Sequence, residues 1–75
     1  MDFETVAKRI INTELSRRGL NKEQLAQKLN DTGFQVTAHS VRNKINYGAF
    51  SFAFFLQCMK AIDAKNISLE DLYRE

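Results

Sequence analysis

Apolar residues recur every three or four positions along most of this chain, and polar residues fill the positions between them. This spacing gathers the apolar side chains on one face of an α-helix, because the helix turns once every 3.6 residues. The pattern predicts five helices, at residues 2–18, 22–30, 38–47, 52–64 and 69–74. Their expected inward residues are Phe3, Ala7, Ile10, Ile11 and Leu15; Leu25, Ala26 and Leu29; Ala38, Val41 and Ile45; Phe52, Phe55, Leu56, Met59 and Ile62; Leu69, Leu72 and Tyr73.

Four of the expected helix starts share a local pattern. An apolar residue precedes Ser, Thr or Asn, and a second apolar residue follows four positions after the polar one. The polar side chain can accept hydrogen bonds from the free N–H groups of the first turn, and the apolar pair can pack across the start as a hydrophobic staple. The instances are Leu20-Asn21…Leu25, Val36-Thr37…Val41, Phe50-Ser51…Phe55 and Ile67-Ser68…Leu72, with capping-box spacing at Asn21–Gln24 and Ser68–Asp71.

Composition favours an all-α fold in one domain spanning residues 1–75. The chain has no proline and only three glycines, at positions 19, 33 and 48, whereas an all-β domain needs many turn residues. Gly19 and Gly48 follow expected helices, where a left-handed residue commonly closes the last turn. A hydrophobic content of 44% excludes a disordered tail.

The lone cysteine, Cys58, has no second cysteine with which to form an internal disulfide and no companions for a metal site. A fold without disulfides fits a reducing cytoplasm, and the apolar neighbours of Cys58 predict that it fills core space. The sequence shows neither a signal peptide nor a run long and apolar enough to cross a membrane. We therefore expect a cytoplasmic protein without membrane contact.

The expected helix 38–47 combines a narrow apolar stripe with a polar and basic outer face. Val41 and Ile45 lie one turn apart and Ala38 joins their stripe. The remaining side chains are of the types that read base edges and bind phosphates in the major groove of DNA. A helix of this kind, behind another helix and a turn, has the arrangement of a DNA reader.

The charge distribution agrees with this interpretation. The net charge is only +2. However, residues 1–48 hold eight Lys and Arg against five Asp and Glu, whereas residues 49–75 hold three against four. The positive part therefore contains the expected reading helix. The alternative is the solvated surface of mixed charge that most small domains have.

The order of these elements resembles a known family. The segment Arg18-Gly19-Leu20-Asn21-Lys22-Glu23-Gln24-Leu25-Ala26-Gln27-Lys28-Leu29 resembles the start of a lambda-repressor-like (Cro/XRE-type) helix-turn-helix domain. The segment 41–46 resembles its recognition helix, and residues 51–62 and 67–72 resemble its fourth and fifth helices. The run 15–73 is also similar to an uncharacterised group of small bacterial and plasmid helix-turn-helix domains, through Arg42-Asn43-Lys44-Ile45, Gly48, Phe50 and Phe54-Phe55-Leu56-Gln57-Cys58.

The resemblance implies a compact five-helix domain that binds double-stranded DNA sequence-specifically, as a small transcription regulator reading the major groove with helix 38–47. The turn 30–36 is several residues longer than is usual in the family. The extra length either tilts the reading helix or makes its own phosphate contact.

Positions on the helix suggest individual roles. Asn43 can pair bidentately with adenine and Arg42 with guanine. Phosphate is favoured near the helix start, and the resemblance places Lys22 on a phosphate. The alternative for all of them is a polar, solvated helix face. The expected base contacts are His39, Ser40, Arg42, Asn43 and Asn46, and the expected phosphate contacts are Lys22, Thr37 and Lys44.

Two further groups have competing interpretations. Arg17 and Arg18 end the first helix, where cations suit the helix dipole, or they attract DNA generally. Phe54 lies off the expected inward stripe and near Ala61, which indicates an exposed contact surface. We expect Phe54, Ala61 and Tyr73 to form a homodimer surface for reading two half-sites. The alternative, that the last helix or the N-terminus covers them, stays open.

Other function classes have less support. A lone His39, without a ligand cluster or a nucleophile beside it, is a poor metal or catalytic residue. We therefore expect no enzyme activity, no cofactor, no metal and no small-molecule substrate. The main alternative to DNA binding is a protein-interaction module, antitoxin-like or adaptor, that keeps the fold without binding DNA.

Overall fold

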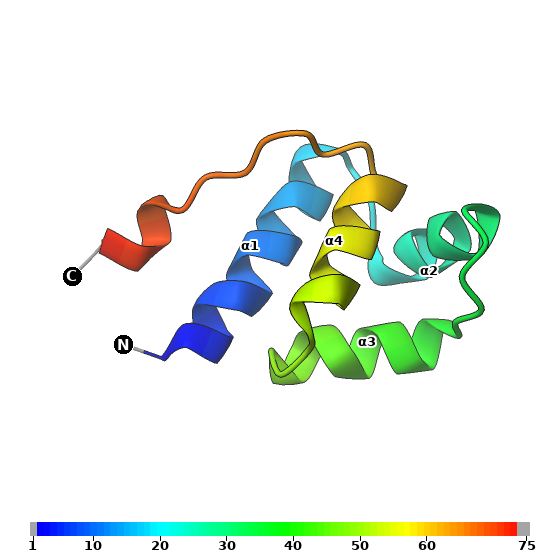
Figure 1. The fold of residues 1–75 in the computed structure, drawn as a ribbon, viewed down its shortest axis with the longest axis horizontal. Helices are drawn as coiled ribbons and strands as arrows, with labels where there is room; N and C mark the ends of the chain where they lie inside the picture. The colour runs from blue at the N-terminus through cyan, green and yellow to red at the C-terminus, as the bar shows by residue number, and fades with distance from the viewer. Residues whose placement is uncertain (1, 74–75) are drawn as a thin grey trace.

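The part of the chain that the computed structural model describes, residues 2–73, folds into helices joined by irregular segments, and no strand occurs in it. The expected all-α fold is thereby confirmed (Figure 1). The expected number of helices is wrong, because the structure has four α-helices and one short 3₁₀-helix. These are α1 (Phe3–Arg17), α2 (Lys22–Asp31), α3 (Ala38–Tyr47), α4 (Phe52–Ala61) and the 3₁₀-helix η1 (Glu70–Tyr73).

Side-chain caps fix the starts of three helices where the sequence predicted them. Asn21 Oδ1 accepts a hydrogen bond from Gln24 N at 2.8 Å, and Gln24 Oε1 accepts one from Asn21 N at 2.9 Å. This is a complete capping box at the start of α2. Thr37 Oγ1 accepts from Ser40 N at 3.0 Å at the start of α3, and Ser51 caps α4 in the same way. The starts of α2, α3 and α4 therefore match the sequence pattern.

The expected fifth helix, 69–74, is wrong over the described residues, and residue 74 lies outside them. Only the single turn Glu70–Tyr73 forms, and none of its residues is buried. Ser68 Oγ accepts from Glu70 N at 3.2 Å, which is two residues on and does not make the expected capping box with Asp71. So short a segment gains too few hydrogen bonds to repay helix nucleation without a packed face. Helix α4 also ends earlier than expected, because Asp63 adopts a left-handed φ of 59°.

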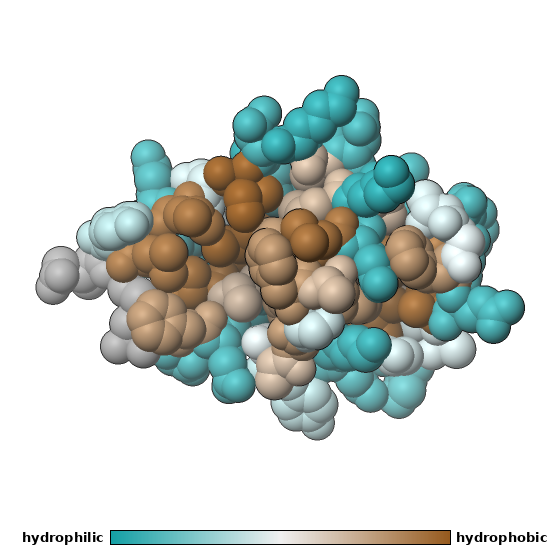
Figure 2. All heavy atoms as spheres, in the orientation of Figure 1, coloured by the Kyte–Doolittle hydropathy of each residue, from teal (hydrophilic) through white to brown (hydrophobic). Residues whose placement is uncertain are grey.

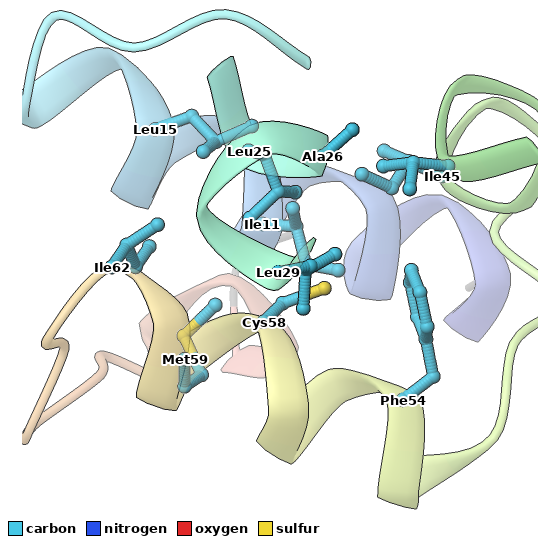
Figure 3. Close-up of a cluster of buried hydrophobic side chains, with 11 residues drawn as sticks. Ile11, Leu15, Leu25, Ala26, Leu29, Ile45, Phe54, Cys58, Met59 and Ile62 are labelled. Atoms are coloured by element: carbon cyan, nitrogen blue, oxygen red, sulfur yellow. The ribbon is translucent and has the colours of Figure 1, made fainter. Parts of the chain in front are cut away.

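The core lies where α2 packs against α3 and α4, and α1 packs against α3. The expected inward stripe of α3 is confirmed, because Val41 and Ile45 are fully buried. Cys58 is also fully buried, as expected. Figure 3 shows most of the cluster converging from all four α-helices: Ile11, Leu15, Leu25, Ala26, Leu29, Val41, Ile45, Phe54, Cys58, Met59 and Ile62.

The inward face of α4 differs from the expected one. Phe52 and Leu56 were expected inside, but 71% and 51% of their surfaces are exposed. Phe54, expected outside, is only 5% exposed and packs in the core against Phe50, with ring centroids 5.7 Å apart. The helix is turned so that Phe54 and Cys58, four positions apart, face inward together. Phe54 therefore cannot belong to an exposed dimer surface.

Three other expected core residues also lie outside, and one of them, Tyr73 in η1, is 82% exposed. Phe3, in the first turn of α1, is 68% exposed, while Val6 is buried instead. Leu69 is 48% exposed, because the segment after α4 runs back along α1 as an extended chain before η1 (Figure 1). All three residues lie near the ends of the described chain, where few neighbours cover them.

Gly48 holds the end of α3 against the start of α1. It closes α3 with φ 67° and is buried. A Cβ atom at this position would lie only 2.9 Å from the Glu4 carbonyl carbon and closer still to its oxygen. Glycine is therefore required both for the left-handed conformation and for the close approach of the two backbones.

Candidate nucleic-acid interface

The outer face of α3 presents all five side chains expected to contact bases. His39, Asn43 and Asn46 are exposed, and Ser40 and Arg42 are partly exposed. Their expected position at the surface is confirmed, whereas their contact with DNA stays a prediction. The sequence of α3 contains no acidic residue, so its own side chains add only neutral or positive groups to this face.

His39 and Asn43 form one arranged pair on this face. Asn43 Nδ2 lies 3.1 Å from His39 Nε2, one turn away along α3. An amide nitrogen can only donate, so this contact is a hydrogen bond in the tautomer of His39 whose Nε2 carries no proton. The Asn43 carbonyl oxygen and its second N–H then remain to meet a base edge.

Arg42 and Asn46 are tied to the first turn of α2. Lys22 Nζ donates to Asn46 Oδ1 at 3.0 Å. Arg42 Nη2 donates to Glu23 Oε1 in an ion pair. Both links join residues that lie about twenty positions apart in sequence, so they depend on how α2 packs against α3.

Glu23 is the member of this site that the sequence analysis missed. An acidic residue in a first turn is already explained by the helix dipole, so its sequence position gave no reason to assign another role. Its contact with Arg42 depends on the packing of α2 against α3. The sequence carries no local signal for a pair separated by nineteen positions.

Two of the three expected phosphate contacts have structural roles as well. The Thr37 hydroxyl oxygen accepts the capping hydrogen bond of α3, although its O–H remains a donor. Lys44 Nζ lies 4.8 Å from the centroid of the Phe54 ring, in the geometry of a cation–π contact. Lys44 is exposed beyond this contact.

The charge of Lys44 also reaches the buried thiol below it. Burial raises the pKa of Cys58 from 9.0 to about 12, and the Lys44 ammonium partly opposes that rise. A thiol with so high a pKa is protonated at neutral pH and unreactive. Cys58 is therefore a core residue, as the sequence predicted.

The comparisons with known proteins place the chain in a family. A family model described as "Domain of unknown function (DUF6471)" matches residues 3–67. The chain belongs to this family. The match spans all four α-helices, including the whole of α3. Neither the curated proteins nor the solved structures contain a significant match.

In this DUF6471 domain, Arg18 is a structural residue. Its Nη1 donates to Glu14 Oε1 at 2.8 Å and to Glu14 O at 2.9 Å, and its Nε donates to Ile62 O at 3.1 Å. Glu14 is only 3% exposed, and Arg17 binds its second oxygen at 3.3 Å. The arginine pair thus neutralises a buried carboxylate and links α1 to the end of α4, a use that neither sequence interpretation included.

A second surface of the DUF6471 domain is apolar. Figure 2 shows brown atoms gathered over α4 and the C-terminal segment. Phe52 stacks on Phe55 with centroids 5.9 Å apart, and Leu56 continues the exposed face one turn later. A shallow hollow of about 270 Å³ lies between this face and the segment 67–69. Of the expected dimer residues, Tyr73 is 82% exposed, Ala61 is partly buried and Phe54 is in the core.

Metal-binding clusters and membrane-spanning helices are both absent from residues 2–73. No group of three or more His, Cys, Asp or Glu side chains there is placed to hold a metal ion. None of the described helices is both long and apolar enough to cross a membrane.

Proposed function

We propose that this DUF6471 domain binds double-stranded DNA sequence-specifically and reads the major groove with α3, as a small transcription regulator. The observation that carries the proposal is the outer face of α3, which offers His39, Arg42, Asn43 and Asn46 together. These side chains have the donors and acceptors that distinguish base pairs in the major groove. Because Val41 and Ile45 are fully buried, the direction of this face is fixed.

The arrangement of α2 and α3 supports a helix-turn-helix interpretation. Residues 32–37 connect the two helices, and α2 is the main packing partner of α3. Lys22, in the first turn of α2, lies 3.0 Å from a side chain of the reading face. A cation and free N–H groups at that helix start suit a phosphate of the same duplex.

Fluorescence anisotropy against a random duplex pool tests the proposal. Affinity should fall steeply with salt, because each phosphate neutralised contributes about 0.9 to the log–log slope. Arg42→Ala should reduce this affinity. Lys60→Ala removes the same charge from an exposed position on α4 and should leave the affinity nearly unchanged. Affinity that is absent at low salt, or equal losses from both variants, would contradict binding through α3.

The regulator is proposed to act as a homodimer on two half-sites about one helical turn apart. With Phe54 buried, the surface must be built from exposed residues, and Phe52 and Leu56 take its place in a proposed surface that keeps Tyr73. A regulator of this bacterial type would act in the cytoplasm without a cofactor, a metal or a catalytic step.

The alternative is a protein-interaction module, and the apolar face favours it. Phe52 and Leu56 expose large apolar side chains in a domain whose other surfaces are mostly polar. A monomer that lacks salt-dependent DNA affinity but binds a protein partner through this face would select the alternative.

A further inference from the structure

Two neighbouring residues of α2 contact two residues of α3 that lie one turn apart. Lys22 binds Asn46, and Glu23 binds Arg42. Positions 42 and 46 share one face of the helix. The first turn of α2 therefore touches both of these reading side chains at once.

Each link fixes the orientation of a recognition group. Lysine has only donors, so the Asn46 carbonyl oxygen must face Lys22, and the amide N–H groups must point away from it. The Arg42 guanidinium has five N–H donors and uses Nη2 on Glu23. The remaining donors still form a fork that can address a guanine edge.

The ion pair between Glu23 and Arg42 is poorly suited to a purely stabilising role. The two side chains are 52% and 40% exposed, and ion pairs of this kind contribute little to stability. Moreover, a carboxylate beside a DNA-reading face repels phosphate. The Glu23 carboxylate would therefore weaken general attraction to DNA while adding little stability to the fold. Its contact with Arg42 needs another explanation.

We propose that Glu23 is a positioning residue that holds Arg42 for one guanine and so exchanges general DNA affinity for sequence discrimination. The inference rests on the proposed DNA-binding function and deepens it. Holding the long arginine side chain before binding lowers the ordering cost of the correct contact. The carboxylate meanwhile lowers the affinity for duplexes that offer Arg42 no guanine.

The test is a comparison of Glu23→Ala with wild type on a selected site, on the same site with the Arg42 base pair changed, and on random duplex. We expect Glu23→Ala to bind random duplex two- to threefold more tightly and to lose about tenfold in discrimination at that base pair. A stabilising residue alone would not move these two quantities in opposite directions.

Asp31→Ala is the matched control. It removes the same charge from the other end of α2, eight positions or about 12 Å away, where Asp31 Oδ1 accepts a hydrogen bond from Gln27 Nε2, one turn earlier. It should leave discrimination unchanged. In the Arg42→Ala background, Glu23→Ala should change discrimination no further, because the arginine that it positions is missing.

The outcomes separate two kinds of failure. If wild type shows no salt-dependent DNA affinity, the proposed function fails and this inference with it. If wild type binds selectively but Glu23→Ala discriminates as well as wild type, or loses discrimination equally in the Arg42→Ala background, only the positioning role of Glu23 is overturned.

Discussion

Among single residues, Arg42 is assigned the most specific chemistry. Replacing it with Ala should weaken binding to the selected site by about 1–3 kcal/mol and relax the preference at one base pair. Anisotropy with single-base-pair variants of the site measures both effects. Lys22→Ala should instead weaken binding without changing the preference at the Arg42 base pair, and it should lower the salt slope by about 1. A uniform loss for Arg42→Ala would assign it to phosphate.

Gly48 is a position where backbone geometry requires glycine. Gly48→Ala should destabilise the fold by more than the cost of about 1–2 kcal/mol for a left-handed alanine, because its Cβ would also meet the Glu4 carbonyl. Gly19→Ala is the control, since Gly19 has a similar φ of 66° with nothing within 4 Å. Urea unfolding compares the two. Equal losses would show that α1 and α3 do not approach so closely.

The raised pKa of Cys58 predicts that the fold becomes less stable at alkaline pH. Its folded pKa is about 12 against an ordinary 9.0, so the folded state holds the proton more strongly than the unfolded state. The contribution of the protonated thiol to the free energy of unfolding is complete below pH 9.0 and is lost as pH rises towards 12. Wild type should therefore lose stability relative to Cys58→Ala above pH 9. If the stabilities of the two proteins change in parallel with pH across that range, the thiol is not buried.

Among the elements, α3 depends on its cap as well as on its packing. Thr37→Ala removes the acceptor for Ser40 N and should cost about 1 kcal/mol, whereas Thr37→Ser keeps the hydroxyl and should cost much less. Thermal unfolding followed by circular dichroism gives both values. If Ser restores nothing, the cap contributes little and packing alone sets the start of α3.

The same helix shows what the sequence could establish. Its expected bounds, 38–47, coincide with Ala38–Tyr47, because Thr37 and Gly48 are strong local signals at its two ends. Its inward stripe was equally clear, since Val41 and Ile45 are its only large aliphatic residues. Local chemistry therefore predicted α3 and the side chains on its outer face.

Helix α4 shows where local chemistry was insufficient. Phenylalanines at 50, 52, 54 and 55 surround the helix start, so several rotations give an apolar inner face. The choice depends on which ring fits beside Phe50 and below Lys44, and that is decided by neighbouring elements. The link from Glu23 to Arg42 was hidden for the same reason, because it exists only where α2 crosses α3.

Across the whole molecule, the polar face of α3, which we propose reads DNA, is separate from the apolar face of α4. The double variant Phe52→Ser/Leu56→Ser should convert a concentration-dependent dimer into a monomer, with little loss of stability because both side chains are already exposed. Sedimentation equilibrium measures the change. Tyr47→Ser is the control, because Tyr47 is 76% exposed but lies at the end of α3. A wild type that stays monomeric at all concentrations would rule out the homodimer.

We propose that DNA contacts this molecule at α3. Titrating ¹⁵N-labelled protein with a selected duplex and following each backbone amide tests it most directly. We expect shifts concentrated in residues 38–47 and in the first turn of α2 at Lys22 and Glu23, with little change at Phe52 and Leu56. Shifts confined to α4, or none at low salt, would contradict the claim.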